Sequence, residues 1–214
     1  MNEIALELLD EIFSRAEDES KICGHEIHVV ELLQSYLISR PEHARAWALY
    51  GEALRELGRN KDSLIALSRA YELASDTYKG HIAMQIAVLA RDFQSPAEAK
   101  KWFEIGIKHL GNEFGWPWII CGSNLVALGE FAAAIICFET TINNNHEEKD
   151  EAYFNLGLVY RALERYEQAI TCFENAIQIT PNYDEAKSAL DGMRNISKTL
   201  NLTLKLRKTL GQIH

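Results

Sequence analysis

The stretch Tyr153–Pro181, which reads YFNLGLVYRALERYEQAITCFENAIQITP, decides the fold of this chain. Its apolar and small residues recur at intervals of three and four, so they lie on one face of each of two successive helices. These residues are Tyr153, Leu156, Gly157 and Tyr160, then Tyr166, Ala169, Phe173 and Ala176. Gly157 and Ala169 are small where two helix axes must approach to roughly 8–10 Å. Pro181 ends the second helix.

The order of an aromatic, Leu-Gly, Tyr, Ala, Phe and Pro at these offsets resembles the tetratricopeptide repeat, with Tyr153 in place of the usual Trp. Related patterns begin at Ala44 and at Gly115, and a weaker one between them uses Ala83, Ile86, Ala87 and Ala90, with two extra residues placed near Asp76 to Gly80. The resemblance implies an all-α fold, a right-handed superhelical stack of helix-turn-helix repeats with a C-terminal capping helix. Each repeat leaves apolar surface at both ends, so it needs neighbours in the stack.

The predicted organisation is one continuous domain with three parts. Residues 1–43 form a helical pair that matches the repeat poorly, with helices over Met1–Ala16 and His25–Ser39. Residues 44–183 form four repeats, and residues 184–214 form a capping helix and a basic tail. Two structures are compatible with the end of the tail. Leu200, Leu202, Leu204 and Leu206 fit either a continuation of the cap helix or an extended arm.

The composition is that of a soluble globular protein, with 47% apolar and 25% charged residues. A net charge of -9 argues against nucleic acid as the main partner. We expect no signal peptide and no membrane span, because the first ten residues carry acidic groups and no continuous apolar run. Four scattered cysteines favour reduced thiols and a cytoplasmic location.

In stacked repeats of this family the first helices line a concave groove, and the side chains facing it stand one step round from the packing face. The candidate groove residues are Arg55, Met84, Val88, Arg91, Trp116, Ile119, Phe154, Leu158 and Arg161. An apolar strip with large aromatic residues is typical of an interaction site. The arginines favour acidic groups, so the expected ligand is a protein or peptide with apolar anchors and acidic residues.

Two alternatives remain open for this groove. The arginines are also compatible with solvated surface residues, some of them paired with Glu52 or Glu56. The apolar strip is compatible with coverage by the cap or tail of the same chain.

The sequence predicts no catalytic residue, no cofactor and no metal site. Cys23, His25 and His28 form the one Cys/His cluster, but a third or fourth ligand at a defined spacing is missing. Phosphate-binding glycine loops, nucleophile elbows and paired acidic motifs are absent from the sequence.

The leading hypothesis is therefore a non-enzymatic scaffold that binds another protein in its groove, as an adaptor, co-chaperone or assembly factor. The alternative is a self-assembling protein, because the chain is asymmetric in charge. Met1–Lys21 carries seven acidic and two basic residues, whereas Gly192–His214 carries five basic and none acidic. In this alternative the basic tail meets the acidic N-terminus of a neighbouring copy, giving a homo-oligomer.

Overall fold

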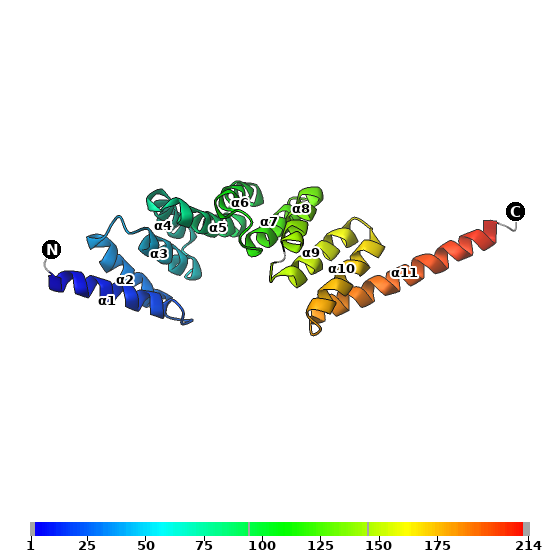
Figure 1. The fold of residues 1–214 in the computed structure, drawn as a ribbon, viewed down its shortest axis with the longest axis horizontal. Helices are drawn as coiled ribbons and strands as arrows, with labels where there is room; N and C mark the ends of the chain where they lie inside the picture. Colours follow the sequence, from blue (N-terminus) through cyan, green and yellow to red (C-terminus); the bar gives the residue numbers. More distant parts are fainter. Residues whose placement is uncertain (1–2, 94, 145, 212–214) are drawn as a thin grey trace. The chain divides into compact units, whose positions relative to one another are not determined.

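The computed structural model describes residues 3–93, 95–144 and 146–211, and every regular element in these ranges is an α-helix (Figure 1). The helices are α1 (Glu3–Glu19), α2 (Glu26–Ser39), α3 (Ala44–Glu56), α4 (Asn60–Leu73), α5 (Asp76–Phe93), α6 (Pro96–Leu110), α7 (Trp116–Ala127), α8 (Phe131–Asn143), α9 (Lys149–Ala162), α10 (Tyr166–Ile179) and α11 (Asp184–Gly211). The predicted all-α fold class is confirmed.

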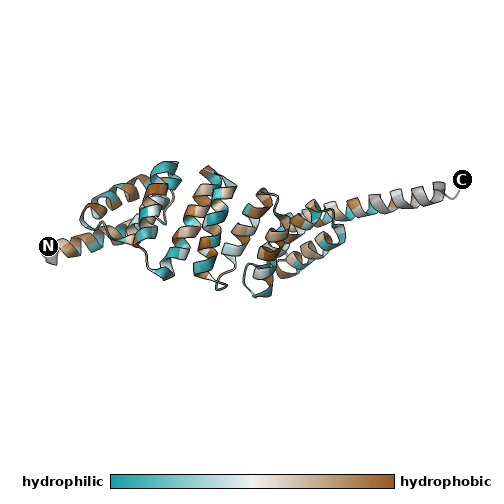
Figure 2. Ribbon diagram, turned by 90° about the horizontal axis from the view of Figure 1, so that it is seen from above, coloured by the Kyte–Doolittle hydropathy of each residue, from teal (hydrophilic) through white to brown (hydrophobic). Residues whose placement is uncertain are grey.

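Contacts divide the chain into two compact units, residues 1–111 with α1–α6 and residues 112–214 with α7–α11. Within each unit, consecutive helices pack side by side. Apolar and polar residues alternate along the helices at helical spacing (Figure 2). The single continuous domain and its division at residues 43 and 183 stay predictions.

A glycine on one helix lies against a bulky side chain on its partner in every helix pair of the four predicted repeats. A β-carbon at Gly157 of α9 would lie only 2.6 Å from Cε1 of Phe173 on α10. A β-carbon at Gly51 would lie 2.7 Å from Cγ of Leu67, and one at Gly122 would lie 2.7 Å from Cε1 of Phe138. Real β-carbons do not approach other atoms so closely, so the absence of a side chain sets the spacing of these helices.

The α5/α6 pair has such contacts in both directions, since a β-carbon at Gly80 of α5 would lie 2.7 Å from Cγ of Leu110 on α6. Here Gly106 belongs to the second helix, and its missing β-carbon leaves room for Met84 Sδ of the first helix, 2.6 Å from the β-carbon position. Ser95 caps α6 by accepting a hydrogen bond from the Glu98 N–H, and Pro96 occupies the first turn, where its missing N–H costs little.

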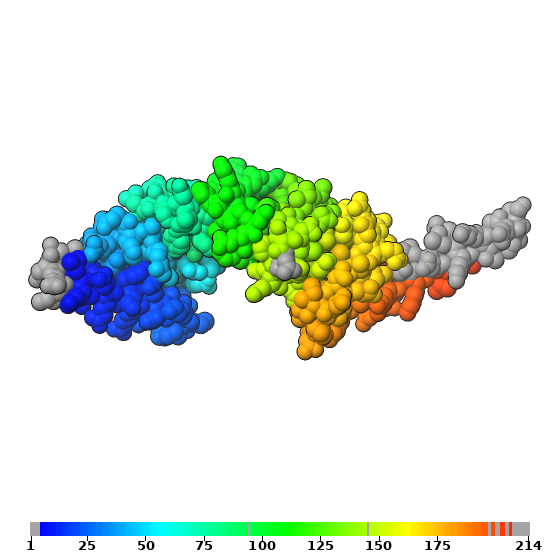
Figure 3. Space-filling view, in the orientation of Figure 1, coloured from blue at the N-terminus to red at the C-terminus, as the bar shows by residue number. Residues whose placement is uncertain are grey.

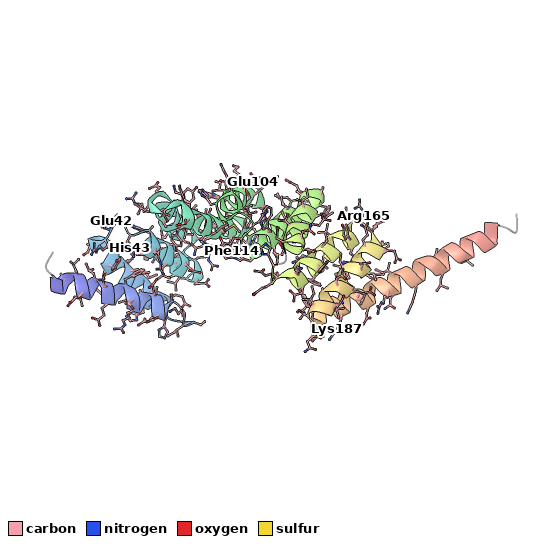
Figure 4. All side chains as sticks on the ribbon, in the orientation of Figure 1. Glu42, His43, Glu104, Phe114, Arg165 and Lys187 are labelled. Atoms are coloured by element: carbon pink, nitrogen blue, oxygen red, sulfur yellow. The ribbon has the colours of Figure 1, made fainter. Side chains whose placement is uncertain are left out.

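The opening pair, α1 and α2, is joined by an aromatic cluster that the repeat signature does not contain. The Phe13 ring lies 5.2 Å from Tyr36 and 4.7 Å, edge-on, from His43 in the connection to α3 (Figure 4). Leu33 and Ala16 are fully buried beside this cluster. Local aromatic packing thus stabilises the pair that matches the signature poorly.

The last helix, α11, is both the cap and the tail. Ala186, Leu190 and Met193 are buried, whereas Ile196 is exposed. The space-filling view shows the start of α11 against α10 (Figure 3). Because α11 continues to Gly211, the tail is helical up to that residue and the extended arm is wrong. No helix in the described residues is long and apolar enough to cross a bilayer.

Within the predicted repeats, the turns of the α3–α4, α7–α8 and α9–α10 pairs each contain a residue at positive φ. Gly58 follows α3 with φ of 71°, and Gly129 follows α7 with φ of 75°. In the corresponding turn after α9, the residue is Glu164, with φ of 59°. A non-glycine residue in this left-handed region is strained.

We predict opposite effects for the same substitution at two helical glycines of the second unit. Gly157→Ala should lower the free energy of unfolding by about 1–2 kcal/mol, because overpacking against Phe173 outweighs the gain in helix propensity. Gly192→Ala should raise it by about 0.5–1 kcal/mol, since no atom lies within 4 Å of its β-carbon position. Urea unfolding followed by circular dichroism measures both. Equal shifts would contradict the close contact at Gly157.

We also predict that His43 makes stability depend on pH. Burial lowers the pKa of His43 below the ordinary value of 6.5, and the nearby charges of Arg45 and Arg40 lower it further. Glu17 and Glu42 act in the opposite direction without cancelling the shift. The unfolded chain therefore binds the proton more readily, and stability should fall as pH drops below about 6.5. His43→Phe, which keeps the contact with Phe13, should flatten urea midpoints between pH 7 and pH 5 relative to wild type. Parallel pH curves for the two proteins would refute this role of His43.

Candidate functional site

An open groove of about 590 Å³ lies between α9 and α11 in the second unit. Its volume is in the range of ligand-binding clefts. Both helices contribute to the lining, which consists of Phe154, Leu158, Arg161, Asp184, Glu185, Ser188, Ala189, Gly192 and Met193. Three of these, Phe154, Leu158 and Arg161, are predicted groove residues, and the structure brings them together.

The apolar part of this α9–α11 groove is held in place by aromatic contacts. The ring of Phe154 lies 5.9 Å from that of Phe173 on α10 and 5.0 Å from that of Tyr183, just before α11. The connection that carries Tyr183 is fixed in turn to α9, because Thr180 Oγ1 donates a hydrogen bond to Asp150 Oδ2. Phe154 is thus a half-buried residue whose position depends on three elements.

The polar part of the groove contains charges of both signs. Arg161 is exposed and has no ion-pair partner among the residues that the structure describes. Asp184 pairs with Lys187 at 3.2 Å on the exposed side of α11, and Glu185 stands beside it. The groove therefore offers an available guanidinium and carboxylates next to an apolar surface, an arrangement that suits a peptide with mixed side chains.

Two of the predicted groove residues, Met84 and Ile119, are buried in the structure. Met84 is 1% exposed because it fills the space at Gly106, and Ile119 is 4% exposed on α7. The α7 helix packs against both α8 and α9, so two of its faces are covered. The prediction that Met84 and Ile119 face a ligand is therefore wrong for this structure.

The other four predicted residues are partly accessible. Arg55 pairs with Glu56, as one alternative expected, and Arg91 pairs with Asp92. Val88 and Trp116 are half-buried. Since Arg55, Val88 and Arg91 belong to the first unit and Trp116 to the second, a single strip through all of them stays a prediction.

The α11 side of the groove was missed by the sequence analysis, although a signal was available. The spacing that selects Glu151, Phe154, Leu158 and Arg161 on α9 selects Glu185, Ser188, Gly192 and Asn195 on α11. Three of these four α11 residues line the groove. The cap forms a wall of the groove and leaves it open.

A second cleft, of about 340 Å³, lies in the first unit between the α1–α2 turn and α3. Four carboxylates line it, those of Glu19, Glu26, Glu52 and Glu56. Glu19 already contacts Arg15, His25 and His28, and the Arg15 hydrogen bond lowers its pKa. Within the described residues, no group of three or more Cys, His, Asp or Glu side chains is arranged to hold a metal ion.

The accessibility and the thiol pKa of each cysteine depend on its burial. Cys121, Cys137 and Cys172 are buried, whereas Cys23 in the α1–α2 turn is exposed. Burial, with a contribution from Glu139, raises the pKa of Cys172 to about 11. The pKa of Cys137 is lowered by a hydrogen bond with Cys121. Since reactivity requires an accessible thiolate, the buried cysteines have a packing role.

Comparison with known proteins identifies the repeats. Residues 150–183 match one family model described as tetratricopeptide repeat, and residues 30–77 match a second model with the same description. The two matches confirm the resemblance found in the sequence, and these two segments are tetratricopeptide repeats. No curated protein matches the chain.

Solved structures agree with this identification of the fold. The crystal structure of YrrB, described as a TPR protein with an unusual peptide-binding site, is 17% identical with a TM-score of 0.67, covering 83% of this chain and 89% of YrrB. A MamA crystal structure is also 17% identical, with a TM-score of 0.68 and coverage of 78% and 96%. BtubC from P. vanneervenii is 15% identical, with a TM-score of 0.72 and coverage of 83% and 81%. At these identities the likeness concerns the fold.

We predict that one of the four cysteines reacts in the folded protein. Cys23 should be modified rapidly by an aromatic disulfide reagent at pH 8, because it is exposed. Cys23→Ser should remove the rapid phase, and the remaining thiols should react only after unfolding in urea. Absorbance of the released thiolate measures each phase. A rapid phase that persists in Cys23→Ser would show that a buried cysteine is accessible.

Proposed function

We propose that this protein is a non-enzymatic adaptor that binds a peptide segment of another protein in the α9–α11 groove. The observation that carries the proposal is the meeting of Phe154, Leu158 and Arg161 along one open groove of about 590 Å³. The apolar side chains provide affinity for a peptide, and the unpaired guanidinium of Arg161 fixes the orientation in which the peptide binds.

The lining residues define the chemistry of the ligand. A large apolar side chain of the peptide packs against Phe154 and Leu158, and a carboxylate nearby in the peptide forms a bidentate pair with Arg161. On the α11 side, Ser188, Ala189 and Gly192 are small, so a peptide backbone can approach closely. Asp184 and Glu185 favour a basic residue at the other end of the segment.

Two further observations support this function. Tetratricopeptide repeats commonly serve as protein-binding scaffolds, and YrrB, with a similar fold, is described by its peptide-binding site. The groove also remains open although α11 of the same chain packs beside it. Both observations favour a ligand from another protein.

Selection from a displayed random peptide library tests the proposal. We expect the selected peptides to pair a large apolar residue with a nearby acidic residue. Leu158→Ala and Arg161→Glu should each weaken a selected peptide about tenfold or more, equivalent to about 1.4 kcal/mol per tenfold. Fluorescence anisotropy with a labelled peptide measures the dissociation constants.

Matched controls separate the groove from the rest of the surface. Ile136→Ala removes an exposed apolar side chain from α8, and Arg165→Glu reverses a charge at the α9–α10 turn (Figure 4). Both controls should bind the peptide as wild type does. Equal losses in groove and control variants, or selection of no peptide at all, would refute the groove as the binding site.

A further inference from the structure

At the start of the outer part of α11, Arg194 pairs with Glu174 of α10 at 2.8 Å, and the described side chains beyond it are exposed. Among the residues whose burial the structure describes, Met193 is the last buried one, and those from Arg194 to Leu206 are all exposed. The helix continues from Met193 to Gly211, a length of about 27 Å at 1.5 Å per residue. This segment, residues 194–211, is called the outer helix below.

The outer helix presents apolar side chains at helical spacing. Ile196 is 39% exposed, Leu202 is 67% exposed and Leu206 is 59% exposed. Thr199 and Thr203, both exposed, fall between them on the same side of the helix. An accessible apolar stripe on a regular helix is the form of surface that pairs with another helix.

Charge selects the kind of helix that fits this stripe. The outer helix carries five basic residues, Arg194, Lys198, Lys205, Arg207 and Lys208, and no acidic residue. Two outer helices would therefore repel one another, whereas an acidic helix would be attracted. Like charges placed across an interface oppose pairing.

The same chain contains an acidic helix at its other end. The α1 helix carries seven acidic residues and one basic residue, Arg15. Glu7, Asp10, Glu11 and Asp18 are exposed, and Leu8 beside them is 56% exposed. The apolar face of α1, with Leu9 and Ala16, is packed on α2, so the acidic face points away from that contact.

We propose that the outer helix of one copy docks on the acidic face of α1 of a second copy. Ile196, Leu202 and Leu206 then pack beside Leu8, and Lys198 of the outer helix faces Glu7 and Glu11. The two surfaces differ, so the contact is heterologous and adds copies head to tail. This function is separate from peptide binding in the α9–α11 groove, since it uses neither Phe154 nor Arg161.

Sedimentation velocity over a range of protein concentrations tests the contact. Wild type should associate at 50 mM salt and dissociate as salt is raised to 1 M, where the Debye length is about 3 Å. Ile196→Ser/Leu202→Ser/Leu206→Ser should sediment as a monomer. Circular dichroism and urea unfolding check that the rest of this variant stays folded.

Charge exchange identifies the docking partner. Glu7→Lys/Glu11→Lys and Lys198→Glu/Lys205→Glu should each weaken self-association, raising its dissociation constant at least ~10-fold. A mixture of the two variants should associate again, because each then meets the opposite charge. Glu7→Gln/Glu11→Gln, which removes charge without reversing it, should have an intermediate effect.

Three results would overturn the proposal. Monomeric wild type at every concentration and salt would exclude the contact. Association that survives the triple Ser substitution would place the interface elsewhere. Loss of association in the Ser variant together with no effect of Glu7→Lys/Glu11→Lys would indicate pairing of two outer helices. Peptide binding in the groove is unaffected by any of these results.

Discussion

The close contact between a glycine and a bulky side chain is the constraint on which both units depend. Gly157 and Phe173 illustrate it, since the ring occupies the volume where a β-carbon would stand. This contact fixes the distance between two helices and also their rotation about their axes. Once rotation is fixed, the residues one step round from Gly157, such as Leu158, have a defined environment. The groove is therefore a consequence of the packing rule.

Much of the fold was predictable because the contact between a glycine and a bulky side chain recurs at a regular spacing in the sequence. The helix pairs from α3 to α10 follow from residues such as Gly51, Gly122 and Phe173, whose spacing is visible in the sequence. The aromatic contacts of His43 were not predictable, because Phe13, Tyr36 and His43 are separated by connections of irregular length. Periodicity predicts contacts within a repeat better than contacts unique to one place.

The candidate site was predictable only in part, for a related reason. Helical spacing places Phe154 and Met84 at equivalent positions, yet Phe154 lines the groove and Met84 is buried. The difference comes from the partner helix, since Gly106 of α6 leaves space that Met84 fills. A stripe on one helix defines a direction, and burial depends on what the neighbouring helices place there. The residues of α11 that line the groove illustrate the same dependence on the neighbouring helix.

The turn at Glu164 has a further consequence for how the repeats are ranked. Its left-handed backbone occurs in the repeat that matches the family signature best, while Gly58 and Gly129 serve the same turn in repeats that match it less well. Resemblance to a consensus therefore does not measure local stability. A repeat can satisfy every position of a recognition pattern and still retain a strained residue outside it. Consensus design based on the signature positions alone would preserve this strain.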